Sequence, residues 1–377
     1  MIWQIAIGLL LAVGGPICGA QERLVPLPTP RRPASQPARP SFLIGAYMQP
    51  PDTFDVWRLR GINTLFGYES RGGTISNKQW SDTAAAKGFY YVRRPGDDPA
   101  ADAADPNLLA WMHDDEPDVK RPPTDPARLQ ADYEAWKRAA PKVPVFLNFS
   151  GGNVLGGKTP KQTYLEYLKA ADWVGNDFYA VTGYNRPDWL WKVGAAVDQL
   201  REWSNDKPQF AFIETSAQRL AWTPRNTRGV TPDELRAEIW HAVIHGVRGV
   251  VYFPQQIGQG FRYDATPPRV ALEMSRQNKR LAELADALVT PMNPKEYGVG
   301  AAAPLEVGWR VAGGRFYVLA LNFSDGAIPA QPIKLTGVGG SGAKAVWDGR
   351  TTEIKSGTIT DNFGPYEVKV YEFAATK

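Results

Sequence analysis

Short apolar runs alternate with amphipathic segments from Ser41 to Leu288. Eight of these runs have the length of a strand, and the two at 143–149 and 249–253 are apolar almost without interruption. Strands that are buried on both faces of a parallel sheet read in this way. The pattern predicts strands over residues 42–47, 64–68, 89–93, 108–114, 143–149, 173–179, 209–214 and 249–253.

Helical patterns lie between these strands, and several of them open with a proline, which suits the first turn of a helix. The clearest predicted helices span residues 125–140, 160–171, 187–205, 232–246 and 267–288, whereas 52–60 and 97–107 are weakly marked. Eight strands that alternate with helices over roughly 250 residues predict an α/β fold, a closed (β/α)8 TIM barrel. An open, doubly wound sheet is the alternative architecture.

The pattern changes after Leu288, where Gly-rich turns separate short strands and no helical period is visible. Predicted strands follow at 307–311, 316–323, 333–335, 344–347, 351–354 and 366–373. Such spacing is typical of a small antiparallel β-sandwich. We therefore expect the barrel over residues 41–290 and the sandwich over 291–377.

The amino terminus has the pattern of a secretory signal over residues 1–20, with an apolar core at 5–13 and small residues before Gln21. A lipoprotein signal that uses Cys18 is the alternative. The apolar stretch is too short to span a bilayer. Residues 21–40 are rich in proline and arginine and predict an extended tether. We expect a secreted or periplasmic protein.

Composition narrows the chemistry. Cys18 is the only cysteine, so the mature chain forms no disulfide and no thiolate metal site. The net charge of +4 is small and the basic residues are scattered, so nucleic acid is not an expected partner. No cofactor or metal is expected, and the oligomeric state stays open. Many of the 13 Trp and 15 Tyr belong to a core, while others can stack on sugar rings.

Polar and aromatic residues follow the predicted strand ends. In a β/α barrel the carboxyl ends of the strands converge on one mouth, where sites form. Carboxylates and amides bind hydroxyl groups while rings stack on sugars, so the set suits a neutral oligo- or polysaccharide. The candidate binding residues are Tyr47, Tyr68, Glu69, Arg94, His113, Asp115, Asn148, Asp177, Tyr179, Trp222 and Gln255.

Two glutamates are the candidate catalytic residues. Glu116 follows the fourth predicted strand and Glu214 ends the seventh. Two carboxyl groups that flank a glycosidic bond can divide the acid, base and nucleophile roles. The acid must be protonated near neutral pH, and the neighbouring Asp114 and Asp115 would raise the pKa of Glu116.

Glu116-Pro117 after strand four, with Glu214 ending strand seven, resembles the clan of retaining β-glycoside hydrolases with a (β/α)8 barrel. The resemblance implies that Glu116 is the general acid/base and Glu214 the nucleophile, and that Tyr179 orients the nucleophile. The chain departs from the clan in having Asp115 where an asparagine is usual and Phe253 where strand eight often ends in tryptophan.

Other functions stay open beside a retaining glycosidase. A non-catalytic glycan-binding protein could use the same barrel, and an inverting glycosidase could employ Asp115 or Glu69. His241 and His245 have metal-ligand spacing, but their apolar neighbours favour a structural role. A Ser-His-Asp esterase is not expected, because the chain has three histidines and no Gly-x-Ser-x-Gly motif.

Overall fold

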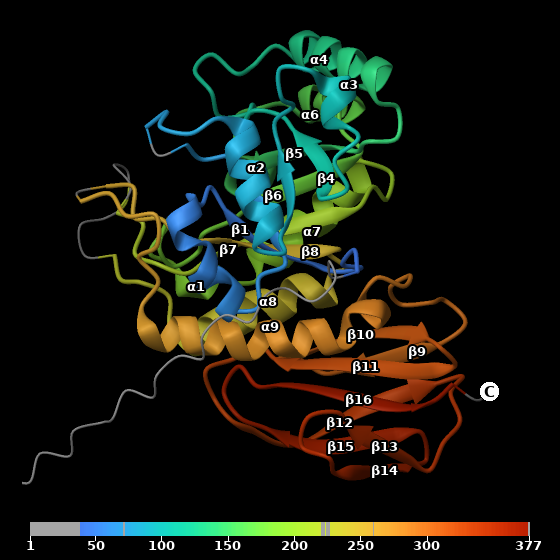
Figure 1. Ribbon diagram of the computed structural model, residues 1–377. Coiled ribbons are helices and arrows are strands. Elements are labelled where there is room, and N and C mark those ends of the chain that lie inside the picture. Colours follow the sequence, from blue (N-terminus) through green and yellow to red (C-terminus); the bar gives the residue numbers. More distant parts are fainter. Residues whose placement is uncertain (1–37, 71, 220–222, 224–226, 259, 376–377) are drawn as a thin grey trace, which may run out of the picture. The chain divides into compact units, whose positions relative to one another are not determined.

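The computed structural model describes residues 38–70, 72–219, 223, 227–258 and 260–375 (Figure 1). The predicted signal, nearly all of the predicted tether and Trp222 lie outside these residues. Among the described helices, none is both long enough and apolar enough to cross a membrane.

Eight parallel strands close into a barrel in sequence order, as predicted. Strand β1 pairs with β2 on one side and with β8 on the other, where Leu43 lies opposite Gly249, so the sheet has no open edge. The doubly wound alternative is therefore wrong. The strands are β1 (Leu43–Tyr47), β2 (Thr64–Phe66), β3 (Tyr90–Arg93), β4 (Leu108–Met112), β5 (Val145–Ser150), β6 (Trp173–Asp177), β7 (Gln209–Glu214) and β8 (Gly249–Phe253).

Helices connect these strands, and the five predicted from the pattern are all present. The segment predicted at 187–205 is divided into a short 3-10 turn, Pro187–Trp189, and helix α7. The helices are α1 (Phe54–Leu59), α2 (Asn77–Ala86), α3 (Pro99–Asp102), α4 (Pro126–Ala139), α5 (Gly151–Val154), α6 (Lys161–Lys169), α7 (Lys192–Trp203), α8 (Pro232–Ile244) and α9 (Pro268–Leu288).

Aromatic side chains fill the inside of the barrel. Phe66, Phe146, Phe210 and Phe212 are almost fully buried there and contact one another through their rings. A second core lies between the outer face of the strands and the helices. Because the lower barrel is packed solid, a ligand can enter only at the mouth, where the strands end.

The carboxyl-terminal strands form an antiparallel sheet in the order β10-β11-β16-β13-β14-β15-β12-β9, which fits the predicted sandwich. The six predicted strands are present, whereas β9, with two glycines among its four residues, and the largely polar β15 were not predicted. Their bounds are β9 (Gly298–Ala301), β10 (Leu305–Ala312), β11 (Arg315–Asn322), β12 (Ile328–Thr336), β13 (Gly342–Ala345), β14 (Thr351–Lys355), β15 (Thr358–Phe363) and β16 (Val368–Ala374).

The sheet shares a core with the helices of the barrel. Leu319 of β11 and Val370 of β16 belong to the same buried cluster as Ile239 and Val243 of α8. Arg310 of β10 is almost fully buried and donates to the carbonyl of Val243 at 2.9 Å. The contact lies along α8 and α9, away from the barrel mouth (Figure 1).

Candidate functional site

A cavity of about 350 Å³ opens at the barrel mouth. Its walls combine carboxyl groups, amides and aromatic rings from the loops after β1, β2, β4, β5, β6, β7 and β8. This size and mixture are typical of sites for small ligands. The lining residues are Tyr47, Met48, Glu69, Asp115, Glu116, Ser150, Asp177, Tyr179, Gly183, Tyr184, Gln218, Phe253, Gln255, Ile257, Phe261 and Tyr263.

Asp115 is held in place by two donors. The hydroxyl of Tyr47 donates to one carboxylate oxygen and the amide of Asn148 to the other, each at 2.9 Å. Burial raises the pKa of Asp115, although both hydrogen bonds favour its ionised form. Since both oxygens are engaged, Asp115 is oriented before any ligand arrives.

Glu116 lies beside Asp115 on the loop after β4. Its backbone has φ of 49°, a left-handed conformation that is unfavourable for a side chain other than glycine and recurs at functional sites. Its carboxyl is hydrogen-bonded to that of Asp177. Burial and the nearby Asp115 and Asp118 raise the pKa of Glu116 to about 7. The hydrogen bond to Asp177 lowers this pKa, so Glu116 is partly protonated near neutral pH, within the range that general acid catalysis requires.

Asp177 ends β6 and faces Glu116 across the cavity. One of its carboxylate oxygens is buried and has no hydrogen-bond partner within the described chain. Burial, Glu116 and Asp115 raise the pKa of Asp177 well above its usual value. Two carboxyls in contact cannot both be ionised, so the pair shares a proton and titrates as a unit. The cavity thus holds one proton donor beside one carboxylate.

Aromatic rings form the wall next to these acids. The ring of Phe253 stacks on Tyr47 at 5.9 Å and lies 5.2 Å from that of Tyr179, measured between centroids. The side chains of Ile257 and Phe261 are about half exposed at the rim. Flat apolar surface next to hydrogen-bonding groups suits a sugar ring.

Glu214 does not reach the cavity. It ends β7 as predicted, but it is fully buried and both carboxylate oxygens are occupied. The amides of Val181 and Thr182 donate to it at 2.8 and 2.6 Å, the Thr182 hydroxyl also donates, and Glu238 of α8 is a further hydrogen-bonding partner. The carboxylate thereby fixes the loop after β6, which carries Tyr179. Its predicted nucleophile role stays untested, and this geometry does not favour it.

Three predicted binding residues also face away from the cavity. The hydroxyl of Tyr68 donates to the carbonyl of Ile75, and Arg94 is ion-paired with Asp114. His113 is buried with its Nε2 on the carbonyl of Ala170 at 2.9 Å. These three side chains do not line the cavity, and their contact with a ligand stays untested.

The remaining binding predictions fall at the mouth. Tyr47, Glu69, Asp115, Asp177, Tyr179 and Gln255 line the cavity, and Asn148 supports Asp115 from behind. Contact of each with substrate stays a prediction. Sequence reasoning missed Gln218 and Phe261, which lie on loops beyond the strand ends. Loop length alone does not tell which of their residues turn inward.

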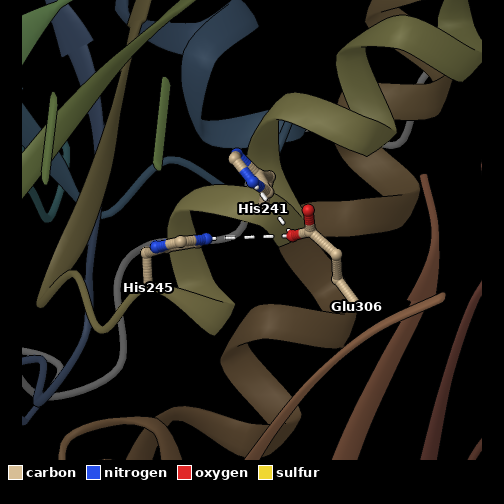
Figure 2. A group of neighbouring side chains, drawn as sticks. All are labelled: His241, His245 and Glu306. Carbon is tan, nitrogen blue, oxygen red and sulfur yellow. Dashed lines mark ion pairs between the residues drawn. The ribbon is translucent and has the colours of Figure 1, made fainter. Parts of the chain in front are cut away.

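A cluster of His241, His245 and Glu306 lies where α8 meets β10, away from the mouth (Figure 2). His241 Nδ1 accepts from the amide of Gly194 at 3.1 Å, so its proton is on Nε2, 3.0 Å from Glu306. A metal on Nε2 would have to displace that proton. This arrangement favours the structural role predicted for the histidines.

His245 holds the cluster to a second carboxylate, with its Nδ1 2.7 Å from Asp198 of α7. Burial alone would lower the pKa of His245, but hydrogen bonds to Asp198 and Glu306 raise it to about 9. Burial would raise the pKa of Glu306, yet the two histidines lower it to about 2. The charged imidazolium therefore joins the barrel to the second sheet.

A family model described as β-galactosidase, glycoside hydrolase family 42, matches residues 127–285. The matched segment runs from α4 to α9 and contains Asp177 and Glu214 but not Glu116. No curated protein matches the chain.

Solved structures of glycosidases share the fold. A family 42 β-galactosidase from G. stearothermophilus has a TM-score of 0.60 at 12% identity, covering 89% of this chain and 98% of that one. A candidate α-galactosidase/melibiase from Bacteroides fragilis has a TM-score of 0.57 at 12% identity, covering 88% and 79%. At such identities the likeness shows the barrel and its appended sheet alone.

The family match supports the assignment of this chain as a glycoside hydrolase, an enzyme that hydrolyses glycosidic bonds. A retaining mechanism fits the clan of that family. The fold predicted from the strand pattern is the fold of these enzymes.

Proposed function

We propose that this chain is a retaining glycosidase whose reaction takes place between Glu116 and Asp177 at the barrel mouth. The observation that carries the proposal is the pair itself: two hydrogen-bonded carboxyls, from the ends of strands four and six, beside an aromatic wall. This assignment keeps the predicted acid/base, Glu116, and replaces Glu214 as its partner. Glu214 becomes a positioning residue that holds the loop after β6.

In the first step Glu116 protonates the glycosidic oxygen while the Asp177 carboxylate attacks the anomeric carbon. The bond to the leaving group breaks, and a covalent glycosyl-enzyme forms on Asp177. Glu116, now ionised, removes a proton from water, which attacks the same carbon and releases Asp177. Two displacements restore the original configuration.

The spacing of the carboxyls favours retention over inversion. Retaining enzymes hold their carboxyl groups about 5–5.5 Å apart, whereas inverting enzymes leave roughly 6.5–9.5 Å for a water molecule. Glu116 and Asp177 are hydrogen-bonded to each other, which is nearer to the retaining than to the inverting separation.

The matching family model makes a galactoside the first substrate to test. The amino-terminal prediction of a signal adds that the enzyme acts outside the cytoplasm. The apolar rim at Ile257 and Phe261 offers a platform for a second sugar beyond the cleaved bond, which suits an oligosaccharide.

The test is a panel of defined oligosaccharides incubated with pure protein, with Glu116→Gln as the matched control. We expect the protein to cleave at least one glycan, and the first product seen by NMR to keep the configuration of the substrate. If every glycan is bound but none is cut, the chain is a glycan-binding protein and the proposal fails. Inverted product would overturn the retaining mechanism alone.

A further inference from the structure

The cavity gathers negative charge. Glu69, Asp115, Glu116 and Asp177 contribute four carboxyl groups to its lining. Of the described residues that line it, none is a lysine, an arginine or a histidine. Like charges so close together repel one another, which costs stability unless a proton or a cation offsets them.

Basic side chains of the loops after β3 and β4 line a different hollow, although the charge of Lys120 still acts on Asp115 and lowers its pKa. Arg94 pairs with Asp114, and both face a separate hollow that Lys120 and His113 also line. That hollow lies on the outer side of the loop after β4. These basic side chains therefore line the separate hollow, whereas the charged side chains that line the cavity are all acidic.

Buried polar atoms in the cavity wall lack partners. Gln218 is fully buried and neither its amide oxygen nor its amide nitrogen has a hydrogen-bond partner within the described chain. The amide oxygen of Gln255 is likewise buried and unpaired, as is one oxygen of Asp177. A buried polar atom without a hydrogen-bond partner costs folding free energy, so these atoms indicate a ligand that supplies the missing hydrogen bonds. Most of these atoms are acceptors, so the ligand must be rich in donors.

Aromatic faces complete the surroundings. Tyr47, Tyr179 and Phe253 pack against one another beside the acids. The electron-rich face of an aromatic ring attracts a cation, most strongly where water is excluded. Carboxylates with aromatic faces are the surroundings in which proteins hold ammonium groups.

We propose that this cavity selects a glycan with a free ammonium group, an amino sugar without its N-acetyl substituent, held by Asp115 and the aromatic wall. The ammonium group donates three hydrogen bonds and offsets negative charge of the carboxyl groups that line the cavity. The same field repels uronic acids and sulfated sugars. The inference rests on the proposed function only in taking the ligand to be a glycan.

Calorimetric titration tests this without turnover. The probes are glucosamine and galactosamine oligosaccharides, their N-acetylated forms and the neutral parent oligosaccharides, at low salt and about pH 6, where an amine of this type is protonated. We expect one of the two amino-sugar series to bind at least tenfold tighter than its parent, a difference of about 1.4 kcal/mol. Added salt should reduce that preference.

Asp115→Asn should abolish the preference, so that this variant binds the amine and the neutral parent equally, whatever its affinity for the parent. Its circular dichroism and thermal unfolding show separately that the variant is folded. The matched control is Asp114→Asn, because Asp114 loses the same charge one residue away, outside the cavity. This control should keep the full preference. Equal or tighter binding of the parent or of the N-acetylated form would overturn the inference, as would a preference that survives Asp115→Asn.

Failure of this inference is distinguishable from failure of the proposed function. Cleavage of neutral glycans without any preference for the amine would leave the glycosidase standing and remove the amino-sugar assignment. Tight binding of the amine without cleavage of any glycoside would support the amino-sugar assignment and remove the glycosidase proposal.

Discussion

Replacement of Glu116 by glutamine tests the proposed proton donor. The pKa of Glu116 is about 7, because the carboxyl is buried beside Asp115 and Asp118. Against the usual value of 4.5, this corresponds to about 3 kcal/mol that disfavour the ionised form, at about 1.36 kcal/mol for each pH unit. The carboxyl therefore keeps its proton up to neutral pH, where the acid is most effective.

We expect kcat/KM of the natural chain to fall as the pH rises above about 7. Glu116→Gln should abolish this basic limb and slow glycosides with poor leaving groups by roughly 10²–10⁴-fold, the usual contribution of a general acid. Glycosides whose leaving group needs no proton should lose much less in the first step. The assay is a pH–rate profile with one glycoside of each kind.

The control is Asp114→Asn, which removes a carboxylate two residues away and leaves the cavity intact. Its profile should match that of the natural chain. The reasoning is refuted if Glu116→Gln keeps the limb near pH 7. An equal loss on good and poor leaving groups would also refute it, since a lost proton donor acts only where a proton is needed.

Four further substitutions probe the site and its scaffold. Asp177→Asn should lower kcat by roughly 10³-fold or more, as loss of a nucleophile does. Glu214→Gln should keep the fall in kcat/KM above about pH 7. It should cost about 1–3 kcal/mol of stability, because a buried amide replaces a carboxylate that accepts from two backbone N–H groups. The pKa of His245 is raised to about 9, so its contribution to stability is complete below pH 6.5 and is lost as the pH rises through about 9. Glu306→Gln should remove about 1–2 kcal/mol of that contribution, allowing for solvent screening, as urea unfolding at pH 6 and pH 9.5 would measure. Gly194→Ala places a methyl group 2.5 Å from the ring of His245 and should cost about 1–3 kcal/mol in the same assay.

Controls exist for these variants. Gly156→Ala adds a methyl group where no atom lies within 4 Å and should be nearly neutral. A loss of activity in Glu214→Gln as large as that in Asp177→Asn, with stability unchanged, would mean that Glu214 takes part in the reaction. A Glu306 variant that unfolds with the same pH dependence as the natural chain would remove the charged link between barrel and sheet.

The barrel was predictable because its signal is repeated. Each strand is an apolar run of five or so residues, and the strands at 209–214 and 249–253 begin and end where the pattern places them. The weakly marked α1 and α3 are six and four residues long, too short to show a helical period. Strands β9 and β15 were not predicted because β9 contains two glycines in four residues and β15 is mostly polar, so neither forms an apolar run.

Which acidic residues lie near the site was predictable from the sequence, but the direction in which each side chain points was not. Asp115, Glu116 and Asp177 follow strands, as expected for a barrel mouth, and all three line the cavity. The direction of Glu214 depends on the loop after β6, whose amides at Val181 and Thr182 capture its carboxylate. No local pattern contains that contact, because 33 and 32 residues separate the partners.

The contact between Glu116 and Asp177 is likewise a product of the closed barrel. Strands four and six are separated by β5, and only the curvature of the sheet brings their ends together across the mouth. The sequence gives each carboxyl a place on a strand, and the barrel supplies the pairing from which the roles are proposed.

The most direct test of the central claim is to trap the glycosyl-enzyme. A fluorinated glycoside of the cleaved sugar, with a good leaving group, slows the second displacement so that the covalent intermediate accumulates. Proteolysis and mass spectrometry then locate the sugar. The account predicts that the label is on Asp177 at the end of β6, and a label on Glu214 would contradict it.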